Sequence, residues 1–83
     1  MKYCIITFRS VTPAQRAEES LRRAGFACTL QRTPKELSVR GCGYCLGLHP
    51  GQVGWAAQLL DAEKVDYGKL YASTAEGYEE LHL

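Results

Sequence analysis

The sequence has no hydrophobic run approaching the roughly 20 apolar residues that a helix needs to cross a lipid bilayer. Its N-terminus, MKYCIITF, has one lysine and a short apolar run, without the longer hydrophobic region and small-residue cleavage site of a signal peptide. It also has no basic run typical of nucleic-acid binding, and no long run of acidic residues that would indicate a basic partner. We therefore expect a cytoplasmic protein that binds neither membranes nor nucleic acids.

The remaining amino-acid balance is that of a small globular domain. The chain has 83 residues, of which 46% are hydrophobic and 23% are charged, and its formal net charge at pH 7 is +1. These proportions favour a folded chain, although one this short buries only a modest core. No internal repeat or low-complexity segment divides the sequence. We expect one domain over residues 1–83, with an acidic and aromatic tail, 73–83, for which the sequence predicts no definite structure.

Cysteine is present at only four positions. An exported protein of this size could pair them in two disulfides. Because the sequence shows no export signal, free thiols, metal ligation or redox chemistry are the better interpretations. Cys4 and Cys28 alternate with apolar residues, which is typical of cysteines in a hydrophobic core. Cys42 and Cys45 instead form a Cys-x-x-Cys pair within a cluster of glycines.

The hydrophobic pattern predicts four strands, the first of them over residues 2–8. This stretch is rich in β-branched and aromatic residues, and both of its faces are fairly apolar, so we expect it to be central in a sheet. Alternation gives one face with Cys4, Ile6 and Phe8, and another with Tyr3, Ile5 and Thr7. Further strands are predicted over residues 26–32, 43–48 and 65–72.

Two helices are predicted between these strands. The first begins near Thr12, which can cap it, with Pro13 at the first helical position. It ends at Gly25, where a left-handed residue often closes a helix. The second opens at residues 49–51 and runs to about Lys64. The buried stripes are Ala14, Ala17, Leu21 and Ala24 in the first helix, and Val53, Ala56, Ala57 and Leu60 in the second.

The order strand-helix-strand-strand-helix-strand is that of the split βαβ, or ferredoxin-like, arrangement. We therefore predict an α+β sandwich with an antiparallel sheet in the order 4-1-3-2 and both helices on one face. In this topology the first strand ends where the third strand and the first helix begin. Cys42 would then lie near the N-terminus of the first helix, around Thr12, with Arg9 at the same end of the domain.

The segment 33–48, TPKELSVRGCGYCLGL, carries the candidate site. Glycines on either side leave the thiol of Cys42 sterically reachable. Nearby cations and the positive end of a helix favour the thiolate, the form that attacks electrophiles and binds metals. Cys42 and Cys45 are the candidate reactive residues. The residues expected to shape their environment are Thr12, Lys35, Ser38, Arg40, Gly41 and Gly43.

The order Pro-basic-x-Leu-Ser followed by Cys-Gly, here residues 34–38 and 42–43, resembles the Se/S carrier protein-like family of small bacterial domains. The opening MKYCIITF and the helical PAQRAEESL are also similar to that family, and the resemblance extends to about Tyr71. It implies a carrier, more than an enzyme with its own turnover, that holds sulfur or selenium on Cys42 as a persulfide or selenosulfide. Its partners would be a donor, such as a cysteine desulfurase, and an acceptor enzyme, and no cofactor is implied.

Three other interpretations remain open. Cys45 could be a resolving thiol in a thiol-disulfide redox or sensing module with Cys42, or a plain strand residue. A zinc site using Cys42, Cys45 and His49 would need a fourth ligand, and His49 is better explained as a helix cap, so we expect no metal. A ferredoxin-like binding module could form a homodimer through the face that carries Tyr3, Ile5 and Thr7.

Overall fold

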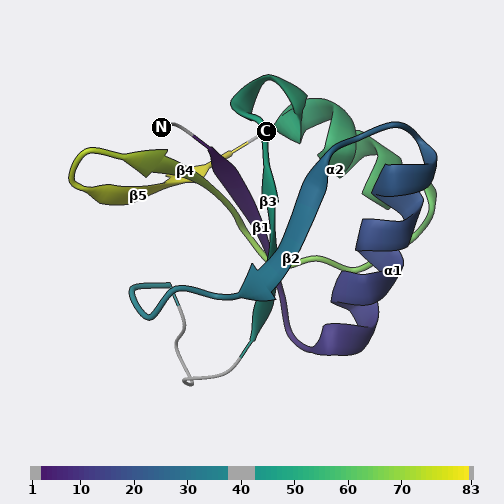
Figure 1. Cartoon of the computed structure of the whole chain (residues 1–83), viewed down its shortest axis with the longest axis horizontal. Helices are drawn as coiled ribbons and strands as arrows, with labels where there is room; N and C mark the ends of the chain where they lie inside the picture. The colour runs from purple at the N-terminus through teal and green to yellow at the C-terminus, as the bar shows by residue number, and fades with distance from the viewer. Residues whose placement is uncertain (1–2, 38–42, 83) are drawn as a thin grey trace.

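The structure is a computed structural model that describes residues 3–37 and 43–82. Figure 1 shows two helices packed on one side of a twisted sheet, whose C-terminal strand hairpin extends away from the helices. Among the described helices, none is long and apolar enough to cross a membrane. The elements are β1 (Cys4–Phe8), α1 (Val11–Arg23), β2 (Cys28–Arg32), β3 (Tyr44–Leu48), the 3-10 turn η1 (Pro50–Gln52), α2 (Val53–Ala62), β4 (Leu70–Thr74) and β5 (Gly77–Leu81).

The predicted α+β class is confirmed, and the sheet differs in detail from the prediction. In the described residues five strands form one antiparallel sheet in the order β2-β3-β1-β4-β5. The predicted order of four strands therefore lacked a fifth strand, β5, which pairs with β4 at the edge of the sheet. That strand comes from the tail 73–83, where β4 continues to Thr74 and the chain turns back at Gly77, whose φ is +134°.

The predicted start of the last strand was also wrong, because β4 begins at Leu70 and not at Val65. Val65 is buried and Tyr67 packs partly against the core, so this connection has the apolar pattern of a strand without pairing as one. Gly68 lies directly beside β1: its N–H donates to the Thr7 carbonyl at 2.6 Å. The segment between α2 and β4 is therefore hydrogen-bonded to the C-terminal end of β1 before β4 begins.

Strand alternation gives the sheet two different buried faces, as the sequence predicted for β1. The helix-covered face holds the main core, to which β1 contributes Cys4, Ile6 and Phe8. Its other members are Ala14, Ala17, Leu21, Cys28, Leu46, Leu48, Val53, Ala56, Ala57, Leu60, Val65 and Leu70. Ile5 and Cys45 are fully buried but belong to the opposite face, which the helices do not cover.

The N-cap of the first helix lies two residues before the predicted cap, Thr12. Its N-cap is Ser10, and Thr12 lies inside the first turn, with Pro13 at the third helical position. A proline is tolerated there because the first four backbone N–H groups of a helix have no intrahelical acceptor. Within the described part of the chain, Ser10 makes no side-chain cap hydrogen bond. The predicted helix end is confirmed, since Gly25 has a φ of +94° directly after the C-cap.

The contact between Gly68 and Thr7 predicts an asymmetry between two glycine-to-alanine substitutions. A Cβ at Gly68 would lie 2.6 Å from Thr7 Oγ1, which is held by the backbone N–H of Lys69 at 2.9 Å. We expect Gly68→Ala to lower the free energy of unfolding by about 1–3 kcal/mol in urea denaturation. The matched control is Gly54→Ala in α2, where a Cβ meets no atom within 4 Å, and which we expect to be neutral or stabilising. Equal losses in both variants would contradict this assignment.

Candidate functional site

The structure describes part of the predicted site. Ser38, Arg40, Gly41 and Cys42 lie outside the described residues. Lys35 is exposed in the connection after β2, and Thr12 is exposed in the first turn of α1. Gly43 directly precedes β3, and Cys45 is the second residue of this strand.

Gly43, the residue bonded to Cys42, lies between the end of β1 and the end of β2. Its carbonyl accepts a hydrogen bond from the Thr33 N–H at 3.1 Å, and the next residue of β3 pairs with Phe8. A Cβ at Gly43 would lie 3.3 Å from Thr33 Oγ1 and 3.5 Å from the Phe8 carbonyl oxygen, and its φ is +147°. A residue without a side chain therefore fits this position best.

This end of the sheet is also where α1 begins. Only Arg9 and Ser10 separate the last residue of β1 from the helix, and both are exposed. The fully described first turn of α1 contains no acidic side chain, so no carboxylate within that turn offsets the partial positive charge of the helix N-terminus. The electrostatic environment beside Gly43 thus combines a helix N-terminus with the cation of Arg9.

Cys45 is a fully buried residue of β3 on the face without helices. Its thiol donates to the Arg32 carbonyl at 3.6 Å. Burial raises the pKa of the Cys45 thiol, and hydrogen bonds from the side chains of Gln31 and Thr33 oppose that rise in part. In this conformation Cys45 is a protonated strand residue that solvent does not reach.

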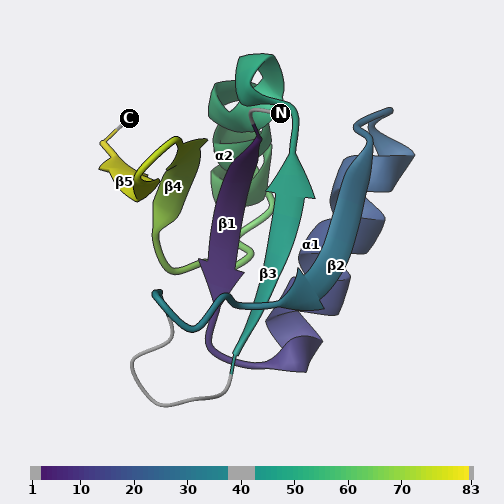
Figure 2. The same cartoon turned by 60° about the vertical axis from the view of Figure 1, so that its left-hand side comes forward.

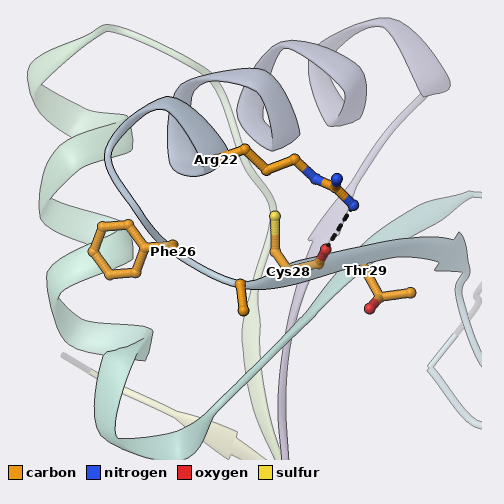
Figure 3. A pocket seen from close by; sticks show the side chains of 5 residues that line it. Arg22, Phe26, Cys28 and Thr29 are labelled. Carbon is orange, nitrogen blue, oxygen red and sulfur yellow. Dashed lines mark hydrogen bonds between the residues drawn. The ribbon is translucent and has the colours of Figure 1, made fainter.

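Cys4 and Cys28 are core residues, as predicted, and burial raises the pKa of each thiol. Figure 3 shows the Cys28 sulfur directed toward α1, with Arg22 reaching across the strand. Nη2 of Arg22 donates to the Cys28 carbonyl at 3.2 Å, and its charge and hydrogen bond partly oppose the rise in the thiol pKa. Arg22 and Cys28 line a hollow of about 290 Å³ together with Phe26, Ala27 and Thr29. The sequence did not predict this hollow, because no sequence pattern links all of its lining residues.

His49 caps the turn before α2. Its Nδ1 accepts a hydrogen bond from the Gly51 N–H at 3.0 Å, which confirms the cap that the sequence favoured. Across residues 3–37 and 43–82, no three His, Cys, Asp or Glu side chains gather as metal ligands. The hydrogen bond to Gly51 shows that His49 stabilises the junction between β3 and α2.

The face proposed for a homodimer is less exposed than the sequence indicated. Ile5 is fully buried within the single chain, while Tyr3 and Thr7 are half-buried. The hydroxyl groups of Tyr3 and Tyr78 lie 2.6 Å apart, so the C-terminal hairpin packs back onto this face. The sequence did not predict the contact between Tyr3 and Tyr78, because Tyr78 lies in the tail for which no strand was predicted.

Comparison with known proteins identifies one family. The model of the family described as putative Se/S carrier protein-like matches residues 3–72, which include β1 to β3, both helices and the beginning of β4. The match ends before β5. No curated protein and no solved structure matches the chain significantly.

The buried thiols predict a loss of stability at alkaline pH. Burial raises the folded-state pKa values of Cys4, Cys28 and Cys45 above the ordinary thiol value of 9.0, so the unfolded chain releases these protons at a lower pH than the folded one. Their contribution is fully present below pH 9.0 and is lost as the pH rises through the folded-state values. We expect the free energy of unfolding, measured with urea under reducing conditions, to fall above that pH. Cys45→Ala should make this fall shallower, and an unchanged slope would contradict the assignment for Cys45.

Proposed function

Because the chain belongs to the family described as putative Se/S carrier protein-like, we propose that Cys42 holds a sulfur or selenium atom for transfer between two partner proteins. The carried form is a persulfide or a selenosulfide on the Cys42 sulfur. The protein then accepts the atom from a donor protein and releases it to an acceptor protein. It needs no cofactor of its own.

The observation that carries this proposal is the position of Gly43. The hydrogen bond from Thr33 and the neighbouring pairing with Phe8 hold the residue after Cys42 at the end of the sheet where α1 begins. A helix N-terminus favours an anion, and a thiolate is the form of cysteine that accepts sulfur. Arg9 at the same end, and Lys35 in the connection that leads to Cys42, add positive charge in exposed positions.

The burial of the other thiols supports a single loading position. Cys4, Cys28 and Cys45 are at most 7% exposed, and burial raises the pKa of each. A donor protein cannot bring a persulfide to a sulfur atom enclosed by the fold, and a protonated thiol is a poor nucleophile. We therefore expect a partner protein to transfer sulfur to the thiol of Cys42 and not to the three buried thiols.

The transfer step is thiol-disulfide exchange with one sulfur atom as cargo. The Cys42 thiolate attacks the terminal sulfur of a donor persulfide, the donor's S–S bond breaks, and the donor cysteine leaves as a thiolate. The same step in reverse, with the acceptor's thiolate as nucleophile, unloads Cys42. Positive charge near Cys42 stabilises its thiolate both before loading and after release.

Loading is tested by mass spectrometry after incubation with a cysteine desulfurase and cysteine. We expect the wild-type protein to gain the mass of one sulfur atom, mapped to Cys42 in peptide digests. Cys42→Ser should remove the adduct, whereas the matched control Cys45→Ser should keep it. The proposal fails if no adduct forms on Cys42 while a known acceptor loads under the same conditions.

A further inference from the structure

Strand β2 is an outer strand of the sheet and pairs only with β3 among the described strands (Figure 2). The hydrogen bond from the Thr33 N–H to the Gly43 carbonyl fixes which backbone groups of β2 face β3. Because the two strands are antiparallel, only alternate residues bond to β3, and the N–H and C=O groups of Cys28 and Leu30 point to the outer edge. Strand β2 therefore offers backbone donors and acceptors to a further strand.

A hollow lies beside this edge, between β2 and the end of α1. It has a volume of about 290 Å³ and is lined by Arg22 of α1, by Cys28 and Thr29 of β2, and by Phe26 and Ala27 between them. Figure 3 shows Arg22 reaching over the strand, where its Nη2 donates to the Cys28 carbonyl at 3.2 Å. A carbonyl oxygen can accept two hydrogen bonds. A further strand can thus pair with Cys28 while the guanidinium group stays beside it.

Two arginines lie on either side of Leu30 along this edge. Cys28 belongs to the main core and Leu30 packs against it, so strand alternation places the side chain of Arg32 on the same face. The Arg32 guanidinium lies 6.0 Å from the centroid of the Tyr44 ring, which also packs against the core. Arg22 lies at the other end, beside Cys28, and its side chain is 62% exposed. The edge thus has a positive charge at each end and an apolar residue between them.

We propose that this edge binds an extended segment of a partner protein as a further antiparallel strand, and that the segment has the pattern acidic-x-apolar-x-acidic. Residues opposite one another in a sheet share a face, so the apolar residue packs beside Leu30. One carboxylate lies opposite Cys28, enters the hollow and bonds to Arg22, and the other forms a cross-strand ion pair with Arg32. The site uses no residue of the sulfur-carrying segment, and it stands whether or not Cys42 carries sulfur.

A second copy of the chain fits this edge less well than an acidic segment. If two copies paired antiparallel through β2 about Leu30, each Arg32 would lie opposite the Cys28 of the other copy, and so beside its Arg22. Like charges would then meet at both ends of the joint, which destabilises a strand pairing. The charges along β2 therefore favour an acidic partner.

Binding is tested by titrating the isotope-labelled protein with the synthetic peptide acetyl-Thr-Glu-Thr-Val-Thr-Glu-Thr-amide and following the backbone amide signals by NMR. We expect the signals of β2 and of the end of α1 to shift, and the Leu30 amide hydrogen to exchange more slowly with solvent. The same peptide N-methylated at valine lacks the N–H that pairs with Leu30 and should not bind. A peptide with lysines in place of both glutamates should bind about tenfold more weakly.

Single substitutions test the role of charge at each end of the edge. Arg22→Gln and Arg32→Gln should each weaken binding of the glutamate peptide about threefold, because each removes one ion pair. Glu18→Gln should strengthen binding by a similar factor, since Glu18 lies 3.5 Å from Arg22 and competes for its guanidinium group. The matched control is Arg23→Gln, which changes an exposed arginine that pairs with Glu19 and does not line the hollow, and should leave binding unchanged.

Shifts confined to β2 and the end of α1, with weaker binding in both arginine variants, support the site. It is refuted if millimolar peptide shifts no signal of β2, or if the N-methylated or lysine peptide binds as well as the glutamate peptide. It is also refuted if the wild-type chain sediments as a dimer that Arg32→Gln stabilises, because the edge then binds a second copy. Arg32→Gln decides the outcome even if Arg22→Gln unfolds the chain. Sulfur loading of Cys42 is a separate measurement, and its failure leaves the binding result standing.

Discussion

The pairing of β1 with β3 is the constraint on which the rest of the structure depends. The antiparallel register sets Phe8 opposite Tyr44 and Thr7 opposite Cys45. The first pair brings Gly43 to the end of the sheet where α1 begins, and the second turns the Cys45 side chain away from the helices. A shift of one residue in this register would exchange the two faces of β3 and would move Leu46 out of the core. The positions of Cys45 and of Gly43, the residue after Cys42, therefore follow from one strand pairing.

The two faces of the sheet give their cysteine thiols different surroundings. The helix-covered face encloses Cys4 and Cys28 among aliphatic side chains, which keeps them protonated. The opposite face also buries Cys45 fully, and its thiol donates to the Arg32 carbonyl. In our account a carrier needs one thiol that partners can reach and others that do not intercept the cargo, and the burial of these three thiols meets the second need.

Sequence patterns predicted what depends on neighbouring residues. Alternation in β1 gave the correct faces for Ile5 and Ile6, and Gly25 marked the end of α1. The family was also recognisable from the sequence, because the residues that carry the resemblance form a short contiguous pattern.

What the sequence could not predict depends on tertiary contacts. Strand β5 carries adjacent exposed glutamates, Glu79 and Glu80, and lacks the alternating apolar pattern of a strand, so only its pairing with β4 identifies it. The hydrogen bond between Tyr3 and Tyr78 joins residues 75 positions apart, and the burial of Cys45 depends on segments beyond its own strand. The sequence thus predicted a Cys-Gly motif, whose Gly43 lies at the end of the sheet where α1 begins, but not the C-terminal hairpin or its contact with Tyr3.

The most direct test of the account is the relative reactivity of the four cysteines in the native wild-type protein at neutral pH. Limited alkylation, resolved by peptide mass spectrometry, gives a rate for each thiol in the same sample. The account predicts that Cys42 reacts first and that Cys4, Cys28 and Cys45 follow much more slowly. It is contradicted if Cys42 reacts no faster than the three buried thiols.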